Sequence, residues 1–216
     1  MELEYVINST IAILKGFKVT YGLFFSTLIF SLPLGLLIAL ARISRYKVLQ
    51  VFTGAYIWLL RGTPLLLQVF FVYFGLPALG ITLNNMTAAI LAFALNYAAY
   101  FAEIFRSGIQ SISKGQYESA DVLGLTYAQT MRRIIIPQMV KRVLPPVSNE
   151  VITLVKDTAL VFGIGLLDVL RTAQIIVTRD FDITAFIIAA VFYLLNTAVL
   201  TFIFRKLEQR YAYYSI

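Results

Sequence analysis

Residues 17–41 read FKVTYGLFFSTLIFSLPLGLLIALA, an apolar run that carries a single charge, on Lys18. A helix needs about 20 such residues to cross the ~30 Å hydrocarbon core of a bilayer. The rest of the chain has the same character, since 60% of its 216 residues are hydrophobic, 13% are charged and the mean hydropathy is +0.83. These values lie outside the range of soluble domains, and they predict one integral membrane domain over residues 1–216.

The chain has five apolar runs of this kind, at 17–41, 51–76, 86–105, 147–167 and 184–204. They predict five transmembrane helices and an all-α fold, because in lipid the backbone polar groups must bond within the protein. Residues 3–15 are apolar on one side only, which predicts an interfacial helix. The stretch 106–146 contains Lys, Arg, Glu, Gln and Gly, so we expect it outside the bilayer. The acidic start, with Glu2 and Glu4, indicates that there is no cleaved signal sequence.

The basic residues predict the orientation, since those near spans prefer the cytoplasmic side. Four lie on one side of the predicted spans: Lys15, Lys18, Arg171 and Arg179. Twelve lie on the other, where they follow spans one, three and five: Arg42, Arg45, Lys47, Arg106, Lys114, Arg132, Arg133, Lys141, Arg142, Arg205, Lys206 and Arg210. We therefore expect the N-terminus outside the cell, and the 106–146 segment and the C-terminus in the cytoplasm. Near that terminus, Tyr211, Tyr213 and Tyr214 are expected in an interfacial aromatic belt.

Several functions are excluded by what the sequence lacks. Without cysteine or histidine the chain has no disulfide framework and lacks the usual metal ligands and acid–base groups. No Gly-x-x-x-x-Gly-Lys-[Ser/Thr] sequence occurs, so the chain is not a P-loop ATP hydrolase. The net charge of +7 does not call for a nucleic-acid partner, because basic cytoplasmic segments account for it. We predict that the chain is not an enzyme and binds no cofactor.

The 106–146 segment contains ESADVLG at 118–124 and, after nine further residues, IIIP at 134–137. A glycine weakens a helix and supplies a bend, whereas a proline is tolerated in the first turn of a new helix. The pattern predicts two short helices that meet near Gly124, with the chain restarting toward span four at Pro137. Such an elbow presents a helix end to a partner protein.

This spacing resembles the cytoplasmic loop of ABC importer permeases, which reads Glu-Ala-Ala, three residues, Gly, nine residues and Ile-x-Leu-Pro. Ser119 stands in place of an alanine and Ile136 in place of the leucine. The residues of the predicted coupling loop are Glu118, Ser119, Ala120, Gly124, Ile134 and Pro137. Three further stretches are similar to permeases of the polar amino-acid uptake family: RGTP at 61–64 with Gln68, EIFR at 103–106, and NE at 149–150 through KDT at 156–158.

The resemblance implies the membrane-spanning subunit of an ATP-driven importer, whose elbow docks in a cleft of a separate ATPase. The implied partners are a second permease subunit, identical or paralogous, two cytoplasmic subunits that bind ATP and Mg, and an extracellular or periplasmic amino-acid-binding protein. The implied location is a bacterial inner or plasma membrane. One alternative class is a stand-alone secondary transporter, but such proteins are often built from inverted repeats, and none is visible here. The other is a membrane-embedded enzyme, which the missing histidine and cysteine disfavour.

Polar residues inside spans are costly in lipid and therefore mark a pathway or a partner. They fall on single helix faces in three sets: Arg61, Pro64 and Gln68; Asn96, Tyr100 and Glu103; and Glu150, Thr153 and Asp157 beside Lys156. If these faces meet, they line a polar cavity. A zwitterionic solute needs a cation for its carboxylate and an acid or acceptors for its amine. The candidate substrate-binding residues are Arg61, Gln68, Asn96, Tyr100, Glu103, Lys156, Asp157 and Thr158.

The same residues have a structural alternative, because charges inside a membrane also pair with one another between helices. Glu103 can pair with Arg106, three residues away, and Arg61 stands beside Gly62 and Pro64, which suggest a distorted helix. The acids Glu103, Glu150 and Asp157 outnumber the bases Arg61 and Lys156 by one. This small excess favours basic amino acids, such as arginine, histidine or lysine, over glutamine or another polar amino acid.

Overall fold

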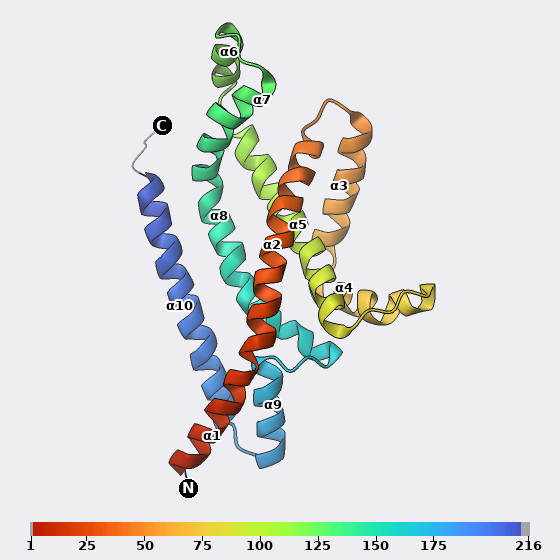
Figure 1. The fold of residues 1–216 in the computed structure, drawn as a ribbon, viewed down its shortest axis with the longest axis vertical. Helices are drawn as coiled ribbons and strands as arrows, with labels where there is room; N and C mark the ends of the chain where they lie inside the picture. Colours follow the sequence, from red (N-terminus) through yellow and green to blue (C-terminus); the bar gives the residue numbers. More distant parts are fainter. Residues whose placement is uncertain (1, 213–216) are drawn as a thin grey trace.

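All secondary structure within residues 2–212, the part of the chain that the computed structural model describes, is helical (Figure 1). The elements are α1 (Glu2–Lys15), α2 (Phe17–Arg42), α3 (Lys47–Gly62), α4 (Leu65–Phe70), η1 (Phe71–Gly75), η2 (Leu76–Leu79), α5 (Asn85–Gln110), α6 (Lys114–Val122), α7 (Tyr127–Thr130), η3 (Met131–Ile135), α8 (Ile136–Asp157), η4 (Thr158–Ile164), α9 (Val169–Asp180) and α10 (Thr184–Ala212). The predicted all-α fold is confirmed. Tyr213 and Tyr214, expected at the membrane interface, lie outside the described residues.

Three helices of the described chain are long and apolar enough to cross a membrane: Leu3–Arg42, Asn85–Gln110 and Thr184–Tyr211. Two bent helix pairs pass the same test when each is taken together, which gives up to five spans by length and composition. The elbow lies at one end of this bundle and the N-terminus at the other, while the C-terminal end of α10 lies on the elbow's side (Figure 1). This relative arrangement is the one that the basic residues predict.

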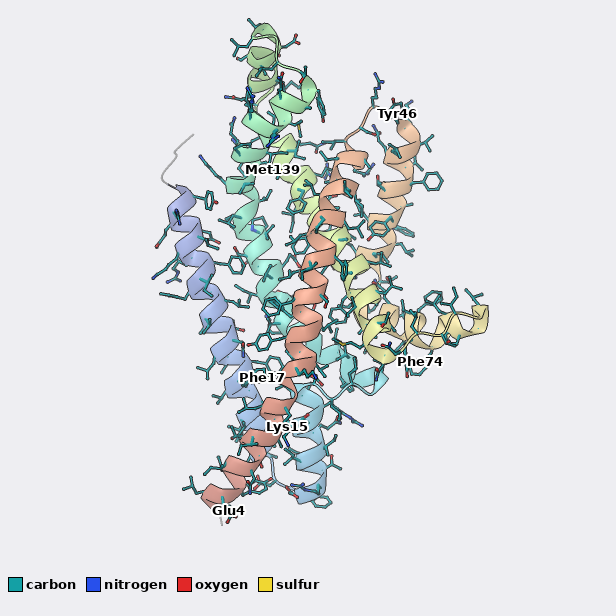
Figure 2. All side chains as sticks on the ribbon, in the orientation of Figure 1. Glu4, Lys15, Phe17, Tyr46, Phe74 and Met139 are labelled. Carbon is teal, nitrogen blue, oxygen red and sulfur yellow. The ribbon has the colours of Figure 1, made fainter. Side chains whose placement is uncertain are left out.

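The junction of α1 and α2 lies in close contact with the backbone at the start of α9. Only Gly16 separates the two helices, between Lys15 and Phe17, which are both labelled in Figure 2. A Cβ atom at Gly16 would come within 2.7 Å of the backbone at Asp168 and Val169, where α9 begins. The helix α1 also packs on α9 and α10 through Ile13, which is 1% exposed. Its expected place along the membrane interface stays a prediction.

The segment 51–76, expected as one span with a distortion beside Arg61, contains a sharp bend. The helix α3 ends at Gly62, and the direction changes by 105° before α4, η1 and η2 continue the chain. Pro64 causes the break, because it has no backbone N–H for a helical hydrogen bond and restricts the residue before it to an extended conformation. Thr63 is accordingly extended, with φ −122° and ψ 148°. In Figure 1 the second part runs sideways from the bundle as an arm that carries Phe74, labelled in Figure 2.

The helix α5 lies at the centre of the fold, where it packs against α2, α3, α4 and α8. Its side facing α2 is rich in alanine, and Ala98 and Ala102 are fully buried. Gly35 of α2 lies so close to this face that a Cβ atom there would be 2.8 Å from the Phe101 Cβ. Small residues let two helix backbones approach closely in a membrane, which is how such contacts are stabilised without a hydrophobic driving force.

The elbow has the predicted form of two short helices, α6 and α7, which meet next to Gly124. Gly124 adopts a left-handed φ of +70°. Its N–H donates to the Asp121 carbonyl at 2.8 Å, and the N–H of Leu125 donates to the Ala120 carbonyl at 3.0 Å. These two bonds close the end of α6 in a Schellman motif, which favours glycine at this position. Thr126 then caps α7 with Gln129 in a capping box.

The last part of the chain begins with α8, which starts at Ile136 with Pro137 in its first turn. The chain thus restarts toward the fourth predicted span where the sequence indicated, while the start of that span at residue 147 stays a prediction. It runs through η4 to Ile164, and Gly165, at φ +79°, then turns the chain by 55° into α9. The helix α10 starts at Thr184 as predicted but extends to Ala212. Only 6% of its most apolar stretch is buried within the chain, so α10 presents apolar side chains to its surroundings.

Candidate functional site

A cavity of about 430 Å³ lies between α3, α5 and α8, on the half of α5 that leads to the elbow. Its wall contains five charged side chains, two from acids and three from arginines. The lining residues are Arg61, Tyr100, Glu103, Ile104, Arg106, Ser107, Gly108, Ser111, Arg142, Val143, Pro146 and Glu150. A cavity with charged groups on opposing helices is suited to a polar solute with charges of both signs.

Arg61 reaches this cavity from the last turn of α3. Its guanidinium carbon lies 5.1 Å from the centre of the Tyr100 ring on α5, within the range of a cation–π contact. The Arg61 side chain is exposed and forms no ion pair among the described residues. Its guanidinium N–H groups therefore remain available to a carboxylate, while the flat face of the guanidinium contacts the Tyr100 ring.

Glu103 pairs with Arg106 on its own helix, which confirms the structural alternative for this residue. The Arg106 Nε donates to both carboxylate oxygens, at 3.1 and 3.0 Å. Arg106 also donates through Nη1 to Gln110 at 2.5 Å. Both partners line the cavity but largely satisfy each other, so their charges contribute less to solute binding than an unpaired charge does.

Glu150 supplies the remaining acid, from α8 on the other side of the cavity. Its carboxylate is half-buried and accepts no hydrogen bond from the residues that the structure describes. Glu150 belonged to a predicted polar face but not to the candidate binding residues. Arg142, Pro146 and Glu150 stand four residues apart on one face of α8, a spacing that could have indicated them. Arg142 also donates to the Ser111 carbonyl at the end of α5.

Asp157, Thr158 and Lys156 do not line the cavity. The Tyr97 hydroxyl donates to the Asp157 carboxylate at 2.7 Å, which links α5 to the end of α8. Thr158, the first residue of η4, is buried and donates to the Val155 carbonyl of α8 at 2.7 Å. Lys156 is exposed on another side of the helix, in a largely apolar groove with Phe186 and Tyr193.

Gln68 and Asn96 bond to each other and to the end of α3. The Asn96 Nδ2 donates to the Gln68 Oε1 at 3.0 Å and to the Leu60 carbonyl at 2.9 Å. Neither residue lines the cavity. Of the eight candidates, the structure thus brings Arg61, Tyr100 and Glu103 together around one space. Contact between any of them and a substrate stays a prediction.

Four of the predicted coupling residues lie in or next to α6 of the elbow, whereas Ile134 lies in η3 and Pro137 in the first turn of α8. Glu118, Ser119, Gly124 and Pro137 are exposed, Ile134 is half-buried, and Ala120 is fully buried against the fold. Three large apolar side chains also stand out from the elbow, because Val122, Leu123 and Tyr127 are 88, 74 and 68% exposed. Apolar side chains clustered in a water-facing segment are typical of a surface that another protein covers.

A bundle of membrane helices around a charged cavity, with an exposed elbow at one end, defines the class of membrane permeases. Residues 31–213 match the family described as binding-protein-dependent transport system inner membrane component. The chain belongs to this family.

Relatives of known type specify the class further. The chain is 40% identical to the probable amino-acid ABC transporter permease protein YckA of Bacillus subtilis, over 98% of this chain and 96% of that protein. It is 39% identical to the arginine transport system permease protein ArtQ of the same organism, over 92% and 91%. It is also 34% identical to the putative glutamine transport system permease protein GlnP of Rickettsia bellii, over 96% and 97%. The chain is an amino-acid ABC transporter permease.

Two solved structures support the same fold. The structure described as an amino acid ABC transporter with histidines superposes with a TM-score of 0.87 at 37% identity, covering 94% of this chain and 96% of that one. An inward-facing form of the MetNI methionine ABC transporter superposes with a TM-score of 0.72 over 92% of this chain and 94% of that one. At 18% identity the second likeness concerns the fold alone.

Proposed function

We propose that this chain carries polar amino acids into the cell as part of an ATP-driven complex. The observation that carries the proposal is the cavity in which Arg61 and Glu150 offer opposite charges from facing helices. Arg61 binds the substrate carboxylate as a planar fork of donors, and Glu150 binds a positively charged group. The printed names of the relatives, which include arginine and glutamine systems, agree with a substrate of this kind.

The substrate we favour is a basic amino acid, such as arginine, histidine or lysine. Arg106 and Glu103 pair with each other, which leaves Glu150 as the cavity acid that has no hydrogen bond or salt bridge among the described residues and interacts with the charge of Arg61 only at longer range. An unpaired carboxylate in a membrane cavity is stabilised by a cationic ligand more than by a neutral amide. Glutamine remains the alternative substrate.

The proposed complex contains a second permease subunit, identical or paralogous, and two cytoplasmic subunits that bind ATP and Mg and hydrolyse the ATP. The elbow residues Val122, Leu123 and Tyr127 are the surface that we expect an ATPase to cover. An extracellular or periplasmic binding protein delivers the amino acid. Coupling requires two states of the complex that ATP and substrate both bias.

The experiment that tests this function measures ATP hydrolysis by the purified complex in lipid, with its binding protein, against a panel of amino acids. We expect arginine, histidine or lysine to stimulate hydrolysis at lower concentrations than glutamine, because Glu150 favours a cation. Apolar amino acids such as leucine serve as controls and should not stimulate. Stimulation by apolar amino acids alone would contradict the proposal.

We propose further that the chain lies in a bacterial plasma membrane with its N-terminus outside and the elbow and C-terminus in the cytoplasm. The excess of basic residues on the elbow's side supports this orientation. A single cysteine placed in the 168–183 segment should react with an impermeant thiol reagent on intact cells, whereas one in the elbow should react only after lysis. The reverse pattern would overturn the orientation and, with it, the ATPase contact.

A further inference from the structure

The bend after α3 leaves the Leu60 carbonyl without the helical donor that a continuous helix would give it. In a continuous helix the Leu60 carbonyl would accept from the N–H of residue 64, but residue 64 is Pro64, which has none. An unpaired carbonyl is costly in a membrane, because no water reaches it there. The 105° change of direction therefore needs donors from elsewhere in the fold.

Two side-chain amides supply those donors. The Gln68 Nε2 donates to the Leu60 carbonyl at 2.8 Å, and also to the Thr63 carbonyl at 3.1 Å and the Thr63 Oγ1 at 2.8 Å. The Asn96 Nδ2 donates to the same Leu60 carbonyl at 2.9 Å and to the Gln68 Oε1 at 3.0 Å. Backbone carbonyls only accept, so both amides must present their nitrogens to the bend. We call this cluster of Leu60, Thr63, Gln68 and Asn96 the amide brace.

The amide brace lies directly beside the cavity residues. Leu60 is the neighbour of Arg61, and Asn96 is one helical turn from Tyr100 on α5. The end of α3 is thus joined to α5 by the Asn96–Leu60 hydrogen bond and by the Arg61–Tyr100 ring contact, and one turn further back the Tyr56 hydroxyl donates to the Leu95 carbonyl at 2.5 Å. Asn96 is 4% exposed, and both of its N–H groups are engaged within the brace, which leaves neither donor for a solute.

We infer that Gln68 and Asn96 are positioning residues, which fix the bend between α3 and α4 and thereby hold Arg61 at the cavity for the substrate carboxylate. This role differs from the direct substrate contact that the sequence suggested for both residues. The inference rests on the proposed function for the part played by Arg61. A displacement of about 1 Å of a binding group is enough to weaken binding or reaction many-fold, so the brace sets the affinity without touching the substrate.

The geometry of the bend is tested by the distance between two spin labels. The chain contains no cysteine, so Phe52→Cys on α3 and Leu79→Cys at the end of η2 give two defined labels on exposed positions. The measurement uses the assembled complex in lipid, with labelled chain diluted in unlabelled chain. In the double variant Gln68→Ala, Asn96→Ala we expect the distance distribution to shift or broaden.

The matched control is Gln50→Ala, which removes a similar bond from a side-chain amide to the Ser44 carbonyl outside the brace. An unchanged distribution in the double variant would overturn the inference.

The link to Arg61 is tested by uptake kinetics for arginine in a double-mutant cycle. Asn96→Ala should raise KM by about 10-fold with kcat nearly unchanged, and it should add little in an Arg61→Ala background, because the two residues act through one contact. Multiplying effects in the double variant would mean that Asn96 binds substrate itself, which overturns the inference. Asn96→Leu, which keeps a similar size but has no donor, is the second variant if Asn96→Ala assembles poorly.

Failure of the proposed function gives a different result. If Arg61→Ala alone leaves KM unchanged, the carboxylate contact is wrong and the positioning role falls with it. The label distances then still decide whether the brace fixes the bend. A defect that is only one of stability would lower the folded yield of Asn96→Ala without raising the KM of the complex that remains.

Discussion

A Gly124→Val chain is expected to insert into the membrane in normal amounts and to transport no amino acid. Valine is β-branched and rarely adopts a positive φ, whereas Gly124 has a φ of +70° that closes the Schellman motif of α6. The strain is conformational and not steric, since a Cβ atom at this position would meet no atom within 4 Å. The elbow must therefore change shape, and the surface around Val122 and Leu123 moves away from the ATPase.

The measurement is uptake into vesicles that contain ATP, normalised to the amount of chain in the membrane. Gly115→Val is the matched control, because Gly115 lies in the same elbow, has open space around it and needs no positive φ. We expect this control to keep most of the uptake. Wild-type uptake by Gly124→Val would remove the elbow from the coupling mechanism.

The second large effect is expected from Glu150→Gln, which keeps the size of the side chain and removes its charge. A hydrogen bond between two ionised groups contributes on the order of 1.5–3 kcal/mol. Loss of the charge should therefore lower the preference for arginine over glutamine by roughly 10- to 150-fold. Glutamine uptake should change less, since its amide bonds to either side chain.

Uptake of arginine and glutamine is compared in the same preparation, so that differences in folded complex cancel. Glu208→Gln on α10 removes a carboxylate away from the cavity and is the control. If the ratio of the two uptake rates stays the same in Glu150→Gln, Glu150 does not select the substrate. Glutamine then becomes as good a candidate as arginine.

Much of the fold follows from the sequence because lipid imposes simple rules. The apolar runs predicted long helices and the glycine with its neighbours predicted the elbow, since both depend on local chemistry. The bend at Pro64 was indicated only as a distortion beside Arg61. The angle of the bend involves donors from α5, such as Asn96, which lies 36 residues from Leu60 in the sequence. The spacing of residues within one segment does not predict contacts between segments that are distant in the sequence.

Only part of the candidate site could be predicted, again because local spacing does not predict contacts between distant segments. Helical spacing shows which residues share a face, so Tyr100 and Glu103 were placed on one face of α5, and both line the cavity. It does not show which faces meet. Lys156 and Asp157 are neighbours in sequence but point about 100° apart on the helix, and the structure directs one to a groove beside α10 and the other to Tyr97.

A structure of the assembled complex with arginine bound within the membrane tests the proposed substrate site most directly. We expect arginine in the cavity between α3, α5 and α8, with its α-carboxylate on Arg61 and a cationic group beside Glu150. Arginine bound in the groove beside Lys156, with the cavity between the three helices empty, would show that this site is wrong.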